Sequence, residues 1–378
     1  MKNYIEQFDP SLHSLSRRHW GILALIATLS ACGGGDAEDD EAVAPLAYGQ
    51  VVPSAWSDAV PALRDGNSGM FVARDYAGVG ASGLIYVNGT EILDGKYEFV
   101  LRQYKNDGTF ITLKRLSTSI NYAHPEQIAV IEEDAADQVL ISVAFTVSSG
   151  MVNKELTAGG YIARLNTKSG ETTKLFESST ICPGGLARDN AGNLYTVDMK
   201  TGDVLQLSAD KNEITVIYKA KPGKSDFPGI DADFVLESKC TVAVTNDGTV
   251  YAMLVAAVHP ASSASYSSSS QWIVRVRNGQ ADRIQPGLAD GEEIGGFGVH
   301  GNDVFCLVNG LVRKIDTAGV ISTVAGTPGS NKTTQFGSPG ALGRTTQWID
   351  LSPDGRIIYL RQAQESPRFY SVLLPVHN

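Results

Sequence analysis

The chain has 378 residues, of which 43% are hydrophobic and 19% charged, and its formal net charge is −10 at pH 7. That length is enough to bury a large core. The five acids of the run 36–41 equal about half of the net charge of the chain after signal removal, so the rest is only mildly acidic. Because phosphate binding needs a basic face, this balance argues against nucleic acid as a partner.

Residues 1–31 read as a signal peptide. Arg17 and Arg18 form a positive segment before an apolar stretch at 21–29, which is too short to span a bilayer as a helix. The sequence Leu29-Ser30-Ala31-Cys32 resembles the lipoprotein box of bacteria. The resemblance implies cleavage before Cys32 and acylation of that residue, and several acyl chains give stable membrane anchoring. The alternative is an ordinary secretory signal that contains an incidental cysteine.

Residues 32–47 are predicted to be the lipidated cysteine and a flexible tether. Three glycines at 33–35 and the acidic run at 36–41 favour a solvated segment without fixed structure. We therefore expect a domain that is held at the bacterial cell envelope, outside the cytoplasm. Gly33 stands where an aspartate would favour the inner membrane in enterobacterial lipoproteins, so the outer membrane is the expectation.

The stretch 182–217 contains four short runs of strand-favouring residues, at 184–187, 194–197, 204–207 and 214–217. Polar segments dense in turn-forming residues separate the runs. This pattern predicts a four-stranded antiparallel meander. Such a sheet has two faces to bury, so similar units must stack beside it, and radial stacking of four-stranded sheets gives a β-propeller.

The residue pattern of this unit resembles the NHL repeat of β-propeller proteins. The matching residues are Pro183, Gly185, Leu186, Ala187, Asp189, Gly192, Asn193, Leu194, Tyr195 and Asp198. The resemblance implies a propeller blade and leaves the subfamily open.

Residues 48–378 are predicted to form one all-β domain, a six-bladed propeller of four-stranded antiparallel blades. A seventh blade is the alternative if residues 48–63 contain a further strand. This first segment could instead complete the last blade, since a closed ring removes sheet edges. The six units are placed at 69–116, 127–176, 182–217, 240–285, 297–325 and 347–374.

Segment lengths differ between the two faces of the predicted propeller. Turns between first and second strands, and between third and fourth strands, are short and share one face. Long segments gather on the other face, which is the candidate binding surface because function concentrates in loops on a rigid scaffold. The long segments are 117–126, 146–160, 219–239, 259–270, 285–294 and 326–344.

Acidic and aromatic residues on this face suit a protein or glycan ligand, with aromatic side chains as anchors. We expect no catalytic residues, since the chain has no Gly-x-Ser-x-Gly elbow, no Walker-type loop and no zinc-ligand spacing. The candidate binding residues are Asp198, Asp231, Asp233, Glu237, His259, Tyr266, Glu292, Glu293 and Trp348.

The alternative function is a cation-dependent envelope hydrolase or lyase related to the sugar-lactone hydrolase propellers. Four carboxylates could supply oxygen ligands for Ca²⁺ at the channel mouth. That family's glutamate and asparagine ligands have no match here, and the expected cofactor is therefore none. The four residues are Asp198, Asp231, Asp233 and Glu237.

Three cysteines remain after Cys32. Cys182 and Cys240 open the first strands of consecutive units, so we predict a disulfide between them in an oxidising compartment. The alternative is that all three are unpaired. Cys306 lies inside an apolar run and is expected to be a buried free thiol. Arginines in third strands are expected to make hydrogen bonds between blades and to pack their aliphatic stems, and the alternative is a ligand-binding ring. They are Arg102, Arg164, Arg275 and Arg313.

Overall fold

A computed structural model gives the structure of the chain. It describes residues 50–53, 64–65, 69–80, 82, 84–93, 96–104, 109–117, 123–133, 135, 137–147, 159–210, 213–220, 234–236, 241–258, 268–284, 294–308, 311–325, 346–351, 357–362 and 368–373. Every regular element within these ranges is a β-strand. Among the same residues there is no helix long and apolar enough to cross a membrane.

Apart from β1 (Gln50–Pro53), the strands up to residue 178 form two antiparallel sheets. The first contains β2 (Arg64–Asp65), β3 (Gly69–Val79), β4 (Ile85–Leu93), β5 (Lys96–Tyr104) and β6 (Phe110–Ser117). The second contains β7 (Ala123–Glu132), β8 (Gln138–Val147), β9 (Gly159–Asn166) and β10 (Thr172–Ser178).

The next two sheets follow the same pattern of neighbouring strands. One contains β11 (Pro183–Arg188), β12 (Leu194–Asp198), β13 (Val204–Leu207) and β14 (Ile214–Tyr218). The other contains β16 (Thr241–Val244), β17 (Val250–Val258), β18 (Ser268–Arg277) and β19 (Gln280–Ile284), and the short β15 (Phe234–Leu236) pairs with the far end of β17.

The last strands form two more sheets. One contains β20 (Ile294–His300), β21 (Asp303–Val308), β22 (Leu311–Ile315) and β23 (Ile321–Ala325). The other contains β24 (Thr346–Leu351), β25 (Ile357–Gln362) and β26 (Arg368–Leu373), and β1 pairs with β26 as its outermost strand.

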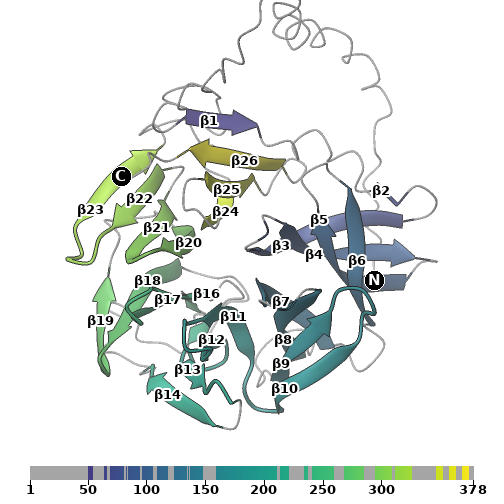
Figure 1. Cartoon of the computed structure of the whole chain (residues 1–378), viewed down its shortest axis with the longest axis horizontal. Helices are drawn as coiled ribbons and strands as arrows, with labels where there is room; N and C mark the ends of the chain where they lie inside the picture. The colour runs from purple at the N-terminus through teal and green to yellow at the C-terminus, as the bar shows by residue number, and fades with distance from the viewer. Residues whose placement is uncertain are drawn as a thin grey trace, which may run out of the picture. The chain divides into compact units, whose positions relative to one another are not determined.

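Five sheets therefore consist of consecutive strands, whereas the sheet of β24–β26 takes its fourth strand from β1. The strand found between residues 48 and 63 thus joins an existing sheet and starts none of its own. The first strands β3, β7, β11, β16, β20 and β24 contact one another in cyclic order, and Figure 1 shows them around the centre of a ring. The all-β propeller with four-stranded antiparallel blades is confirmed.

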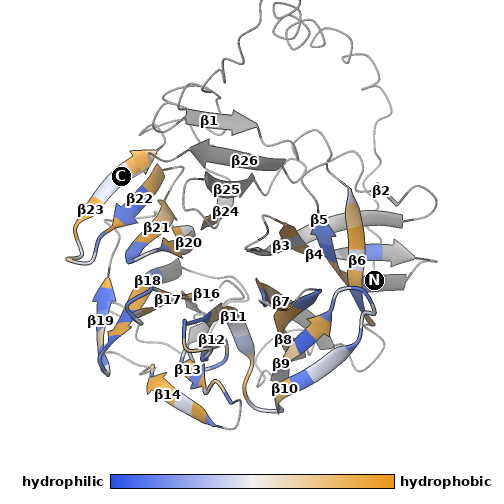
Figure 2. Ribbon diagram, viewed as in Figure 1, coloured by the Kyte–Doolittle hydropathy of each residue, from blue (hydrophilic) through white to orange (hydrophobic). Residues whose placement is uncertain are grey.

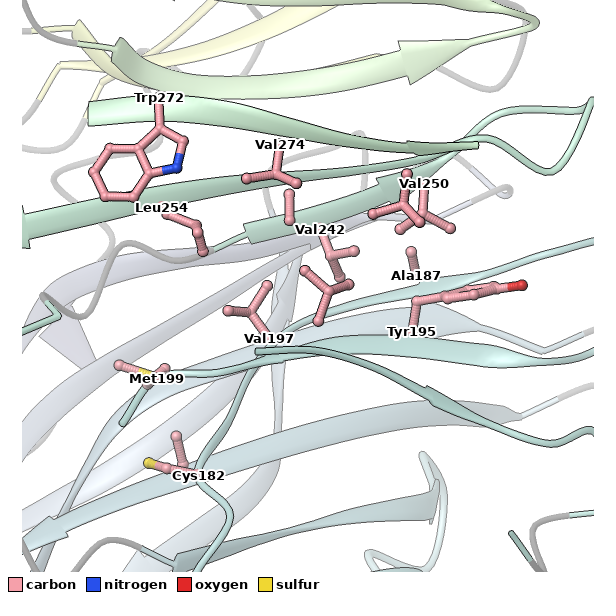
Figure 3. Close-up of a cluster of buried hydrophobic side chains, with 14 residues drawn as sticks. Cys182, Ala187, Tyr195, Val197, Met199, Val242, Val250, Leu254, Trp272 and Val274 are labelled. Carbon is pink, nitrogen blue, oxygen red and sulfur yellow. The ribbon is translucent and has the colours of Figure 1, made fainter. Parts of the chain in front are cut away.

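Apolar side chains between neighbouring sheets form the core. Figure 3 shows one cluster between the sheet of β11–β14 and the sheet of β16–β19, where Val197, Val242 and Trp272 are buried. Outer strands are more exposed: the first four residues of β19 are exposed, and Figure 2 shows that strand as hydrophilic. Burial between radially stacked sheets is what the repeated pattern of the sequence predicts.

Gly185 is needed where β11 approaches β16. A Cβ at this position would lie 2.7 Å from both the Cα of Thr241 and the backbone nitrogen of Val242. We expect Gly185→Val to lower the free energy of unfolding by about 2–3 kcal/mol, because the two blades must separate. Urea unfolding measures this, with Gly279→Asn as the control. A Cβ at Gly279 meets nothing within 4 Å, and asparagine tolerates its φ of 72°. Equal losses of unfolding free energy in the two variants would contradict the need for glycine where β11 approaches β16.

The third-strand arginines do not all occupy equivalent places. Arg164 pairs with Leu140 and Arg275 with Tyr251 across their sheets, and their guanidinium groups bind Glu133 and Asp282 of their own blades. The residues at those places in two other blades are Gln103 and Lys314. Arg102 and Arg313 are one residue out of register, and one residue reverses the face of a strand. For Arg164 and Arg275 the expected inter-blade pairing is wrong.

Candidate functional site

The two faces of the propeller differ in loop length as predicted. On one face, which we call the tight-turn face, backbone hydrogen bonds close turns at 189–193, 245–249 and 316–320. On the other, the long-loop face, β8 and β9 are separated by residues 148–158, and β17 and β18 by residues 259–267. The connections 221–233, 285–293 and 326–345 also belong to this face. These five segments lie outside the described residues.

Most of the predicted binding residues belong to the segments that the structure does not describe. Trp348 lies in β24, the first strand of its sheet, and its side chain is not described. Asp198 is described in full. The candidates outside the described residues are Asp231, Asp233, Glu237, His259, Tyr266, Glu292 and Glu293, and their role in binding stays a prediction.

Asp198 ends β12 and is 4% exposed. Its Oδ1 accepts hydrogen bonds from the backbone N–H of Cys182 at 3.0 Å and of Lys200 at 3.1 Å, and its Oδ2 accepts one from the Thr201 hydroxyl at 3.0 Å. The N–H of Met199 donates in turn to the carbonyl of Cys182. The carboxylate therefore fixes the turn after β12 to the residue that precedes β11.

No group of three or more histidine, cysteine, aspartate or glutamate side chains that could hold a metal ion occurs among the described residues. Asp198 is the described member of the four carboxylates considered for calcium, and its oxygens are engaged with backbone and hydroxyl donors. The structure thus gives this residue a structural role at the long-loop end of its blade.

Two of the cysteines are described, and both are buried. The Cys182 thiol lies 3.6 Å from the carbonyl oxygen of Phe145 in the neighbouring blade. Cys240 is outside the described residues, so its pairing with Cys182 stays a prediction. Cys306 is a buried free thiol as expected, and burial raises its pKa to about 12.

Hydrogen bonds between blades hold the beginnings of first strands, and the sequence analysis missed them. The amide oxygen of Gln271 in β18 accepts a hydrogen bond from the N–H of Ile294, which begins β20. The Ser142 hydroxyl in β8 donates to the carbonyl of Gly184 in β11 at 2.6 Å. In the sequence, the available indication of such a bond was a single polar residue beside an apolar run, as for Gln271, or within one, as for Ser142. These bonds join the long-loop ends of neighbouring blades.

On the tight-turn face, Asp189 organises the NHL-like turn. Its Oδ1 accepts from the N–H of Ala191 and of Asn193, and its Oδ2 accepts from the Asn193 amide and the Tyr195 hydroxyl, each at 2.8–3.0 Å. Burial raises the pKa of this carboxyl, but the hydrogen bonds outweigh burial and lower the pKa below 3.8. Burial and the Asp189 carboxylate raise the pKa of Tyr195 to about 12.

The lowered pKa of Asp189 gives a pH-dependent prediction. A depressed pKa stabilises the fold above the unfolded value of 3.8 and loses that effect as the pH falls below it. Asp189→Ala should therefore lower the free energy of unfolding by about 2 kcal/mol at pH 7 and by less at pH 3. Urea unfolding of both proteins at the two pH values measures this. If Asp189→Ala lowers the free energy of unfolding by the same amount at pH 3 as at pH 7, the lowered pKa of Asp189 does not contribute to stability.

No family model matches the chain, and no curated protein matches it. Solved structures are similar at low identity. Virginiamycin B lyase from Staphylococcus aureus is 11% identical, with a TM-score of 0.42 over 81% of this chain and 94% of its own. An auxiliary nutrient binding protein from Bacteroides thetaiotaomicron is 13% identical, with a TM-score of 0.44 over 79% of this chain and 68% of its own.

The PQQ-bound aldose sugar dehydrogenase from Streptomyces coelicolor is 13% identical, with a TM-score of 0.40 over 81% of this chain and 98% of its own. Fold alone does not determine function. Function has to be argued from the two faces of this chain.

Proposed function

We propose that the chain is a lipid-anchored propeller of the bacterial cell envelope that binds a protein or glycan through its long-loop face. Cys32 carries the lipid in this proposal, and the outer membrane is the expected membrane. The domain acts as a binding module and performs no chemistry. The NHL-like turn built around Asp189 supports a relationship to NHL-repeat propellers.

The difference in length between the two faces is the observation that carries the proposal. Turns on the tight-turn face are closed within a few residues by backbone hydrogen bonds. The long-loop face combines long segments with strand ends that hydrogen bonds join between blades, and binding sites commonly occur in loops on such a scaffold. Aromatic and acidic residues in those segments suit sugar stacking or a protein hot spot.

We count the blades as six. The cyclic contacts among the first strands and the pairing of β1 with β26 support this number, because the sheet of β24–β26 reaches four strands only with β1. Closure by the first strand leaves β26 without an open edge.

A calcium-dependent hydrolase or lyase is the competing function, and calcium dependence separates the two. We expect the melting temperature of the mature chain to stay within about 1 °C when millimolar calcium or a chelator is added, because no ion contributes to folding. Differential scanning calorimetry measures this. A melting temperature that rises with calcium and falls with chelator would favour the calcium-dependent enzyme over the binding module.

Lipidation and ligand binding are tested on the purified full chain. Mass spectrometry of the N-terminal peptide should find an acylated Cys32, and Cys32→Ser should release the protein from membranes. A panel of envelope polysaccharides and peptides should contain a ligand that binds saturably and is recovered unchanged. Turnover of such a ligand would contradict a pure binding role.

A further inference from the structure

Strand β14 is an outer edge of the propeller that carries no charged residue. It is the last strand of its sheet, and among the described residues β13 is the strand that pairs with it, on one side. Figure 1 shows β14 at the rim of the ring, and Figure 2 shows it as largely hydrophobic. The strand Ile214–Tyr218 consists of residue types that favour extended structure, and Val216 at its centre is 51% exposed.

Other outer strands have features that discourage a further strand from pairing. Three of them contain charged residues, which protect sheet edges in natural proteins. These are Lys114 and Arg115 in β6, Lys174 and Glu177 in β10, and Asp282 and Arg283 in β19. β1 contains Pro53, which has no N–H to donate. β23 is uncharged, but the residues that flank it, Val320 and Gly326, are uncharged as well.

The sequence around β14 is complementary in charge to a second copy of itself. When two copies of the strand are paired antiparallel over their full length, Ile214 of each lies opposite Tyr218 of the other, and the two Val216 residues face each other. In this register Glu213, directly before the strand, lies opposite Lys219, directly after it. Both flanking residues are exposed, and neither forms an ion pair with another described residue. The two-fold axis repeats this favourable pair of opposite charges.

We propose that the free edge of β14 is a docking site for a second copy of this chain, through a two-fold antiparallel pairing centred on Val216. The contact is isologous, because the same strand serves both partners. It joins two four-stranded blades into one continuous sheet and pairs backbone groups that the edge leaves open. Since each strand has five residues, the interface is small and the association is weak and reversible. The inference is independent of the proposed function, because it involves neither Cys32 nor the long-loop face.

Charge reversal tests the pairing and its register. Sedimentation velocity of the purified full chain, from about 10 µM to about 1 mM, should show dimers that increase with concentration. Glu213→Lys places cations opposite each other and Lys219→Glu places carboxylates opposite each other, so each variant alone should associate at least about tenfold more weakly. An equimolar mixture of the two variants should regain the affinity of the unchanged chain, because every cation then faces a carboxylate.

A lysine in the middle of the strand tests which edge pairs. Val216→Lys brings two cations together at the two-fold axis and should also weaken association at least about tenfold. Thr323 is an exposed residue at the centre of β23, so Thr323→Lys is the matched control and should associate like the unchanged chain. The proposal is overturned if the unchanged chain stays monomeric at about 1 mM, if Val216→Lys associates as strongly as Thr323→Lys, or if the mixture associates no better than its two components.

Discussion

Replacing Glu91 by alanine should lower the free energy of unfolding by about 3–5 kcal/mol, because a buried ion pair loses one partner. The side chains of Glu91 and Arg102 are both fully buried, with 3.2 Å between Oε1 and the guanidinium nitrogen. Arg115 binds the second carboxylate oxygen, and Arg102 also lies over the ring of Phe110 at 4.3 Å. Without the carboxylate, two guanidinium groups would face each other across β5 and β6.

The control for this variant is Glu177→Ala. Glu177 pairs with Lys174 at 2.5 Å, and both side chains are more than half exposed. An exposed pair contributes at most about 1 kcal/mol, so this substitution should have little effect on urea unfolding. The double variant Glu91→Leu/Arg102→Met should recover most of the stability that Glu91→Ala loses. A loss below about 1 kcal/mol for Glu91→Ala would contradict the buried pair.

Removing β1 should destabilise the whole domain. A chain that begins at residue 54 lacks the four residue pairs between β1 and β26. At about 1 kcal/mol per hydrogen bond, the loss is about 4 kcal/mol, which corresponds to a fall of about 6 °C in melting temperature for a domain of this size. The open edge of β26 should also promote aggregation. Calorimetry and light scattering measure these effects.

A chain that begins at residue 46 is the matched control, because it lacks the signal and most of the tether but retains β1. It should melt at the temperature of the full mature chain. If the chains that begin at residues 46 and 54 melt at the same temperature, closure of the ring by β1 is not a source of stability.

The repeated pattern of apolar runs and turns predicted the architecture well, because each blade is built from local hairpins. Turn residues such as Asp189 and Gly192 lie at the turns that the sequence indicates, and Gly192 has a φ of 86°. Pairing between the two ends of the chain depends on closure of the ring, and no local pattern encodes it. The sequence of residues 48–63 therefore allowed two interpretations, a strand of a seventh blade or a strand that completes the last blade. The pairing of β1 with β26 supports the second.

Register was the main source of error. Arg102 and Arg164 looked equivalent by their distance from neighbouring turns, yet one residue of offset places Arg102 on the opposite face, where it is fully buried. Asp198 was predicted as a possible ligand because an acid ends an apolar strand, and its part in binding stays a prediction. Its carboxylate accepts hydrogen bonds from the N–H groups of Cys182 and Lys200, a contact that no local pattern of the sequence indicated.

The most direct test of the central claim is a comparison of ligand binding after changes to each face. In one variant, residues 259–267 are replaced by Asn-Gly, which joins β17 to β18 by a tight turn. In the other, the exposed tight-turn residues Lys168, Thr317 and Ala318 are replaced by glutamate. For a ligand found in the binding panel, we predict that the first variant loses at least about tenfold in affinity, equal to about 1.4 kcal/mol, and the second binds normally. Normal binding by the first variant with loss in the second would contradict the account.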